Sequence, residues 1–235
     1  MKNRIWELDA LRGLCILAMV AVHLVYDLVS LFGLAAWEIS GGFRFLMDWG
    51  GVVFVLLSGC CATLGSNPLG RGFQVFGCGL LISAVTVGLV ALGFDPGSII
   101  YFGVLHCLGG CMVLWHFLRR LPRPWLLLLS ILAVAAGLWL AGRTFAVAWL
   151  VPMGFMPHAF ITADYFPLLP HLGFFLLGAL AGERLYRQRR SLLPGVDGTK
   201  QPVAFLCACG RHSLWIYLLH QPVITGLLWM LSLTA

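Results

Sequence analysis

Seven long, unbroken apolar runs dominate this sequence, and each is long enough to cross a lipid bilayer as a helix. A membrane-spanning helix needs roughly 20 mostly apolar residues. Lipid offers the backbone no hydrogen bonds, so only helices or closed barrels can span it, and continuous rather than alternating apolar runs favour helices. The sequence therefore predicts an all-α, polytopic transmembrane bundle with spans at residues 11–32, 43–64, 73–92, 101–118, 125–141, 166–185 and 214–231.

Composition excludes an ordinary soluble domain. Hydrophobic residues make up 60% of the chain and charged residues 10%, and the mean hydropathy is +0.94. A soluble domain carries about 25% charged residues. The first run contains a histidine and an aspartate and lacks the small-residue cleavage site of a signal peptide, so we expect it to be retained. The sequence has no recognisable soluble segment, low-complexity tract or repeat, so we predict one domain over residues 1–235.

The positive charges predict the orientation, because Lys and Arg flanks stay in the cytosol. With the N-terminus inside and the C-terminus outside, 13 of the 15 Lys and Arg residues lie on the cytosolic side, and only Arg44 and Arg143 lie outside. The net charge of +6 then belongs to an inner rim that faces anionic lipid. It requires no nucleic-acid partner.

Residues 144–161 form an eighth apolar stretch that we do not expect to span the membrane. Pro152 and Pro157 interrupt it. If it crossed, the cluster of Arg187, Arg189 and Arg190 would be forced outside. We therefore predict a re-entrant or interfacial lid on the outer face.

The cysteines predict neither a disulfide framework nor a metal site. Six of the eight fall inside predicted spans, where they act as small apolar side chains. Cys207 and Cys209 are separated by one residue, which is too short for the usual metal pair, and they lie on the reducing side.

Gly178 and Gly182 have the spacing of a close helix contact. We favour a contact within one chain, with a homodimer interface as the alternative.

Ionisable residues inside spans cost roughly 2.5 to 3.5 kcal/mol each on insertion scales, so each needs a partner or a purpose. The first span contains Arg12 at its inner rim and His23 about 16 Å further on. Asp27 is four residues after His23 and shares its helix face, so it could orient the imidazole as a general base. The alternative is that Asp27 only neutralises a structural histidine or bonds to a neighbouring helix.

The last span places His220 and Gln221 near the middle of the membrane, just before Pro222. Proline frees the carbonyl of Leu218, four residues earlier, which a side chain or ligand could satisfy. Tyr217 lies on the same face as His220. We favour a role in a cavity over a histidine bonded only to backbone.

Three further polar residues are candidates near the outer side. His106 lies about 8 Å below the outer rim of the fourth span. Asp48 could contact a substrate or pair with Arg44, four residues away. Asp164 could recognise a hydroxylated or amino substrate at the outer mouth, or cap the following helix.

These residues lie in motifs that resemble a known family. Arg12, ten residues and then His23, within residues 8–23, resemble the opening helix of membrane-embedded acyltransferases. Residues 101–106, 164–170 and 210–222 narrow the resemblance to prokaryotic proteins grouped with the catalytic domain of heparan-α-glucosaminide N-acetyltransferase. The similarity spans nearly the whole chain.

The resemblance implies transfer of an acyl group across the cytoplasmic (inner) membrane of a bacterium. Acetyl-CoA or another acyl-CoA would enter from the cytosol, and a glycan-type amine or hydroxyl acceptor would be met near the outer side. Coenzyme A phosphates would find cationic and polar partners at the inner rim, where we place Arg12, Arg211, Ser213, Arg119 and Arg120.

In this interpretation His23, oriented by Asp27, is the base, and His220 or His106 stabilises the oxyanion or relays the acyl group. The residues expected at the acceptor are Asp48, Asp164, Tyr217 and Gln221. Two other classes remain open: a proton-coupled transporter of small molecules, since intramembrane His and Asp also form proton relays, and a non-catalytic membrane protein.

Overall fold

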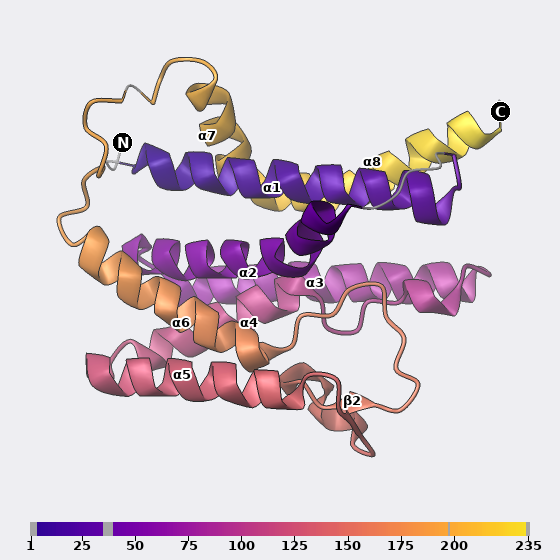
Figure 1. Cartoon of the computed structure of the whole chain (residues 1–235), viewed down its shortest axis with the longest axis horizontal. Coiled ribbons are helices and arrows are strands. Elements are labelled where there is room, and N and C mark those ends of the chain that lie inside the picture. The colour runs from indigo at the N-terminus through magenta and orange to yellow at the C-terminus, as the bar shows by residue number, and fades with distance from the viewer. Residues whose placement is uncertain (1–3, 35–39, 197, 234–235) are drawn as a thin grey trace. The chain divides into compact units, whose positions relative to one another are not determined.

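Helices make up most of the described chain, as the apolar runs predict (Figure 1). The structure is a computed structural model that describes residues 4–34, 40–196 and 198–233. Its α-helices are α1 Trp6–Tyr26, α2 Gly41–Leu64, α3 Pro68–Ala91, α4 Val104–Leu118, α5 Arg123–Leu140, α6 Leu168–Leu185, α7 Val203–Arg211 and α8 Ser213–Ser232. The prediction of an all-α, polytopic bundle is confirmed.

Six of the helical segments in the described ranges are long and apolar enough to cross a membrane. They coincide with six of the seven predicted spans. The six segments are α1 together with the π-helical turn that follows it, and helices α2, α3, α5, α6 and α8. The fourth predicted span is shorter than expected, because α4 has 15 residues and begins at Val104 rather than at Tyr101. At 1.5 Å per residue it is about 22 Å long, less than the roughly 30 Å of a hydrocarbon core.

The chain groups into two compact units. The first unit comprises Met1–Leu57 and Tyr186–Ala235, and the second comprises Ser58–Leu185. Helix α2 begins in the first unit and ends in the second. A single domain over residues 1–235 stays a prediction.

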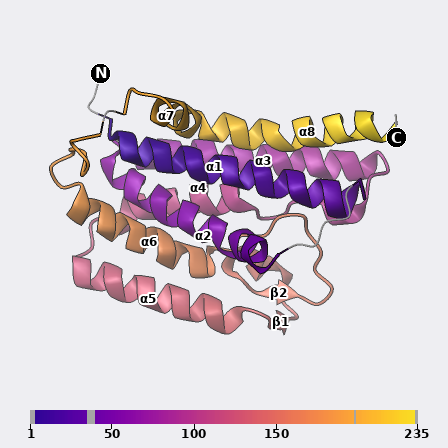
Figure 2. The same ribbon diagram turned by 45° about the horizontal axis from the view of Figure 1, so that its top comes forward.

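In the first unit, α1 continues directly into the π-helical turn Asp27–Leu31. Helix α8 runs in the same direction as α1, and α7 packs against the first half of α1 (Figures 1 and 2). A Cβ atom on Gly13 would collide with the carbonyl oxygen of Leu206, and one on Gly210 with that of Asp9. Helices α1 and α7 therefore meet backbone to backbone, at positions that only glycine can occupy.

In the second unit, α3 pairs with α4, and α5 pairs with α6. Glycine again permits the close approach: a Cβ on Gly109 would meet Phe76 of α3, and one on Gly137 would meet Pro170 of α6. Gly182 of α6 lies against Cys60 at the end of α2. The contact at Gly182 is thus made within the chain.

Residues 144–161 contain no long helix, so the prediction that they do not form an eighth span is confirmed. They fold as two short parallel strands, β1 Thr144–Phe145 and β2 Met156–Pro157, around the 3₁₀-helix Ala148–Met153. The sequence does not predict this pairing, since each strand has only two residues.

An extended segment before α4 explains why that helix starts late. Phe102 forms a parallel bridge with Tyr165. The amide of Ala163 donates to the carbonyl of Ile99 (3.1 Å), and the amide of Phe166 donates to that of Phe102 (3.0 Å). The carbonyls of Ile99 and Phe102 are thereby paired with the 162–166 loop and are not available for helical hydrogen bonds.

Candidate active site

His220 of α8 has one ring nitrogen engaged and the other unengaged. Its Nδ1 is hydrogen-bonded to the backbone carbonyl of Tyr217, one turn earlier on the same helix. Because a carbonyl only accepts, Nδ1 must carry the proton, and the neutral ring then has its lone pair on Nε2. That Nε2 is buried and has no hydrogen-bond partner in the described chain.

His23 of α1 lies directly beside this imidazole. The two ring centroids are 5.0 Å apart, with the planes at 71°, so one ring presents its edge to the face of the other. Both histidines belong to the first unit, although 197 positions separate them in the sequence. The structure thus brings together two of the four predicted catalytic residues.

Asp27 does not orient His23 as the four-residue spacing predicts. Its carboxylate accepts a hydrogen bond from Nε2 of Gln221 at 2.8 Å. In the described ranges the bond between Asp27 and His23 is a backbone one, from the amide of Asp27 to the carbonyl of His23, and does not involve the imidazole. Asp27 is 2% exposed and begins the π-helical turn, where the wider turn departs from the α-helical register that the prediction assumed. The structure thus has the alternative that the sequence left open, in which Asp27 bonds to a neighbouring helix, as a carboxylate-amide pair with Gln221 of α8.

Gln221 has a buried atom without a partner, as His220 does. Its Nε2 is used by Asp27, whereas Oε1 is buried and unbonded in the described chain. Two adjacent residues therefore offer two buried hydrogen-bond acceptors, Nε2 of His220 and Oε1 of Gln221. Leaving a buried acceptor unpaired costs roughly 1 to 3 kcal/mol, so the pair is suited to a ligand that carries hydrogen-bond donors.

The ring of Tyr217, also predicted to lie at the site, is 5.4 Å from that of His220. We define the polar cluster of the first unit as His23, Asp27, Tyr217, His220 and Gln221. Its elements are α1, the π-helical turn and α8, and the i to i+3 and i+4 spacing of helices places the last three residues on neighbouring turns.

Arg12 serves the helix contact between α1 and α7. Its Nη2 donates to the carbonyl of Gly210 at 2.8 Å and to the carboxylate of Asp9 at 3.2 Å. Asp9 also pairs with Arg4 at 3.5 Å. The Arg12 side chain is 20% exposed. A guanidinium held in this way braces α7 on α1, so the structure gives Arg12 a bracing role that the sequence did not indicate.

The other predicted phosphate-binding residues fall into two groups. Arg211 is exposed at the end of α7, and Ser213 is half-buried at the start of α8, both in the first unit. Arg119 and Arg120 are exposed after α4, in the second unit.

His106, the fourth predicted catalytic residue, belongs to the second unit, and both its ring nitrogens have partners. Nδ1 accepts from the backbone amide of Gly103 at 3.3 Å, and Nε2 lies 3.4 Å from Oγ of Ser83. The Ser83 hydroxyl in turn donates to the carbonyl of Ile100. His106 is 2% exposed, and a Cβ on Gly79 would be 3.0 Å from its ring. Because the imidazole of His106 is buried and both its nitrogens have partners, its contacts are those of a residue that stabilises the fold.

Asp164 caps a different helix from the one that sequence suggested. Its Oδ2 accepts from the backbone amide of Val104 at 3.0 Å, at the first turn of α4 and 60 residues away. An adjacent tyrosine is also fixed: the Tyr165 hydroxyl donates to the carbonyl of Val151 at 2.8 Å, and burial raises its pKa to about 12. These contacts tie the 162–166 loop to the second unit.

Asp48 lies on α2, but its side chain is outside the described part of the structure. Its predicted role at the acceptor stays a prediction.

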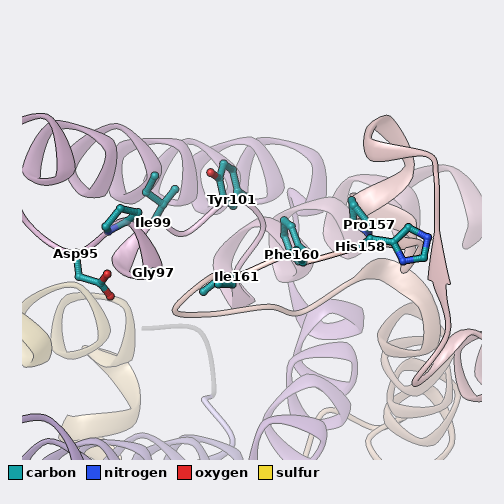
Figure 3. Close-up of a pocket in the computed structure, with 10 residues that line it drawn as sticks. Asp95, Gly97, Ile99, Tyr101, Pro157, His158, Phe160 and Ile161 are labelled. Atoms are coloured by element: carbon teal, nitrogen blue, oxygen red, sulfur yellow. The ribbon is translucent and has the colours of Figure 1, made fainter.

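A cavity of about 470 Å³ lies in the loops of the second unit, between residues 95–101 and 157–161. Figure 3 shows Tyr101 and Phe160 between Asp95 at one end and His158 at the other. The two aromatic rings are 5.6 Å apart. Sequence reasoning missed this cavity because its walls come from two loops without a recognisable motif.

In the described ranges, no group of three or more His, Cys, Asp or Glu residues is arranged to hold a metal ion. All eight cysteines are free thiols.

The fold and the polar cluster define a multi-pass helical membrane protein with imidazole, carboxyl and amide groups inside its helices. Among protein-family models, the one described as heparan-alpha-glucosaminide N-acetyltransferase, catalytic, matches residues 4–222. The chain belongs to this family, a family of membrane acetyltransferases, as the sequence motifs predict. No protein of curated function matches the chain, and no solved structure matches it.

Proposed function

We propose that the protein is an integral membrane acyltransferase that moves an acetyl or other acyl group from cytosolic acyl-CoA to an amine or hydroxyl of a glycan-type acceptor at the outer side. The observation that carries the proposal is the free lone pair on Nε2 of His220, held in a fixed tautomer next to a second imidazole. Family membership supplies the reaction class.

His220 acts as the general base in this proposal. As the nitrogen or oxygen of the acceptor attacks the thioester carbonyl, Nε2 takes the proton from the acceptor. The bond between the acyl carbon and sulfur then breaks, and the sulfur of coenzyme A leaves with a proton. The products are the acylated acceptor and free CoA thiol, so atoms and charge balance.

His23 stabilises the oxyanion that forms on the thioester carbonyl. Its ring is in edge-to-face contact with His220, and a ring N–H is a suitable donor to a developing negative charge. This assignment exchanges the roles that the sequence suggested for His23 and His220. Transient acylation of an imidazole, which would split transfer into two steps, is the mechanistic alternative.

The donor enters from the cytosol in this proposal, with the N-terminus on that side of the cytoplasmic membrane. The exposed Arg211 is the first-unit cation that is suited to a phosphate of coenzyme A, because Arg12 is held by Asp9 and a backbone carbonyl. Ser213, Arg119 and Arg120 are further proposed contacts. Arginine guanidinium groups recognise phosphate through two parallel N–H bonds.

The proposal is tested with purified protein in liposomes, radiolabelled acetyl-CoA and glucosamine as the acceptor. We expect acetylated glucosamine and free CoA thiol to appear in equal amounts. A His23→Ala variant should lose transfer while it keeps the folded state in detergent, and a variant at the exposed His158, outside the polar cluster, is the matched control.

Two results would contradict acyl transfer. One is the absence of both CoA binding and thiol release with every amine or hydroxyl sugar tried. The other is full turnover in the His23→Ala variant, which would remove His23 from the reaction. A proton flux across CoA-free liposomes would instead favour a carrier, since buried imidazole and carboxyl groups also form proton relays.

A further inference from the structure

The hydrogen bond between Asp27 and Gln221 fixes which end of the Gln221 amide faces the polar cluster. A carboxylate can only accept hydrogen bonds, whereas an amide has a donor end and an acceptor end. Because Oδ2 of Asp27 receives the N–H of Gln221 at 2.8 Å, the amide nitrogen must face Asp27. The carbonyl oxygen, Oε1, is then turned away from the carboxylate.

That oxygen lies where no other group of the described chain satisfies it. Oε1 of Gln221 is buried and unbonded, and so is Nε2 of the preceding residue, His220. If the amide were rotated by 180°, an acceptor would face the carboxylate of Asp27, and the buried unpaired atom of Gln221 would be a donor. The bond to Asp27 prevents this rotation.

We infer that Gln221 determines which acceptors bind and favours amines, by accepting a hydrogen bond from the second N–H of the amino group whose other proton His220 removes, and that Asp27 is a positioning residue that holds the amide in this orientation. The inference rests on the proposed function. A site that is built to accept a substrate N–H or O–H rejects analogues that lack it, because its own buried acceptors stay unpaired.

Asp27 is suited to this positioning role. It is 2% exposed, and it starts the π-helical turn, whose backbone is closed by the bond from the amide of Phe32 to its carbonyl at 2.8 Å. The backbone of Asp27 cannot move without breaking that turn. π-Turns inside helices are frequent at functional sites.

The experiment exchanges the two groups. Asp27→Asn removes the acceptor-only partner, so the Gln221 amide is free to rotate. Gln221→Glu places two buried carboxyl groups against each other, which disfavours their ionisation. In the double variant, which carries both substitutions, the new amide at position 27 donates to the new carboxylate at position 221. The bond is thereby restored, and the other oxygen of the side chain at position 221 is again a free acceptor.

We expect each single substitution to raise the KM for glucosamine by roughly 5- to 150-fold, the cost of one unpaired buried group, with little change in the KM for acetyl-CoA. The double variant should recover most of the loss. Thr225→Val is the matched control: Thr225 donates to the backbone carbonyl of Gln221 at 2.7 Å but takes no part in the amide orientation. Its KM for glucosamine should equal that of the wild type.

Binding of glucosamine to CoA-free protein, followed by thermal shift in detergent, gives the same comparison without turnover. If wild-type protein never transfers an acyl group but the binding losses and their recovery are seen, the proposed function is wrong and the role of Gln221 stands. If the double variant binds no better than the weaker single variant, or if both KM values rise together, the inference is wrong whether or not transfer occurs.

Discussion

Two histidines in the helices of this protein, His106 and His220, differ in what their ring nitrogens contact. His106, in the second unit, receives a backbone N–H on one nitrogen and faces a serine hydroxyl with the other. His220, in the first unit, uses one nitrogen on a carbonyl of its own helix and leaves the other buried and unpaired. Both ring nitrogens of His106 thus have partners within the protein, whereas one ring nitrogen of His220 has none in the described chain.

The difference shows that burial alone does not identify a functional residue in a membrane protein. A satisfied network rigidifies a helix bundle, whereas a buried group that lacks its partner lowers stability and is retained for another reason. Of the two histidines compared, His220 is therefore the candidate for a reactive group, and the chain of Ser83, His106 and Gly103 stabilises the second unit.

The largest expected effect is on catalysis, from His220→Ala. Removing the base should lower turnover by about 10²- to 10⁴-fold. The hydrogen bond lost is the one to the backbone carbonyl of Tyr217, together with the ring contacts to His23 and Tyr217, so we expect the protein still to fold. Thiol release from acetyl-CoA measures the effect, and circular dichroism in detergent checks the fold. Turnover close to that of the wild type would erase the contrast between the two histidines.

His106→Ala should show the opposite pattern. The substitution empties a slot between Phe76, Phe102 and Gly79 and leaves the Gly103 amide unpaired. We expect the free energy of unfolding to fall by about 2–4 kcal/mol, as for other large-to-small changes in a core. Denaturant unfolding in bicelles measures this, with His158→Ala as the exposed control. Turnover per folded molecule should stay near that of the wild type; its loss would make His106 catalytic after all.

Asp164→Ala tests whether that residue is a helix cap rather than a substrate contact. Losing the bond to the Val104 amide should cost about 1 kcal/mol, the usual value of an N-cap. Asp164→Asn keeps an oxygen acceptor and should recover most of the stability. Asp95→Ala, at an exposed carboxylate of the same unit, is the control. A rise in the KM for glucosamine without a change in stability would return Asp164 to the acceptor site.

The smallest effect is expected from Ser83→Ala, which shortens the chain of bonds that holds His106. The variant loses the contact to the imidazole and the bond to the Ile100 carbonyl. We expect about 0.5–1.5 kcal/mol of lost stability and unchanged kinetics. Because Thr86 on the same helix also bonds the Ile100 backbone, Thr86→Val provides a comparison of similar size. An effect of Ser83→Ala on turnover would connect this network to the reaction.

Most of the fold could be predicted from the sequence, because an apolar run of about 20 residues has few alternatives in lipid. The exceptions are α4 and α7. Helix α4 loses its first turn to a pairing with the 162–166 loop, which is 60 residues away and has no local signal. Helix α7 has only nine residues and is positioned by contacts of Gly13 and Gly210 that depend on the tertiary structure.

Less of the candidate site could be predicted, although its members were found. Helical periodicity correctly placed His220 and Tyr217 on one face of α8. It failed for Asp27, since the π-helical turn changes the register and the true partner, Gln221, is 194 residues away. It also could not show that Arg12 is held by the Gly210 carbonyl, because backbone acceptors are the same at every position in a sequence.

The long sequence separation of the first unit's contacts has a consequence for synthesis on the ribosome. Asp27 and Arg12 must enter the membrane with α1, yet Gln221 and the Gly210 carbonyl follow 194 and 198 residues later. At synthesis rates of about 5–20 residues per second, those groups wait roughly 10 to 40 s for their partners. We expect the nascent first helix to stay beside the translocon or an insertase during that interval. The helices of residues 58–185 would assemble with one another before the first helix finds its partners.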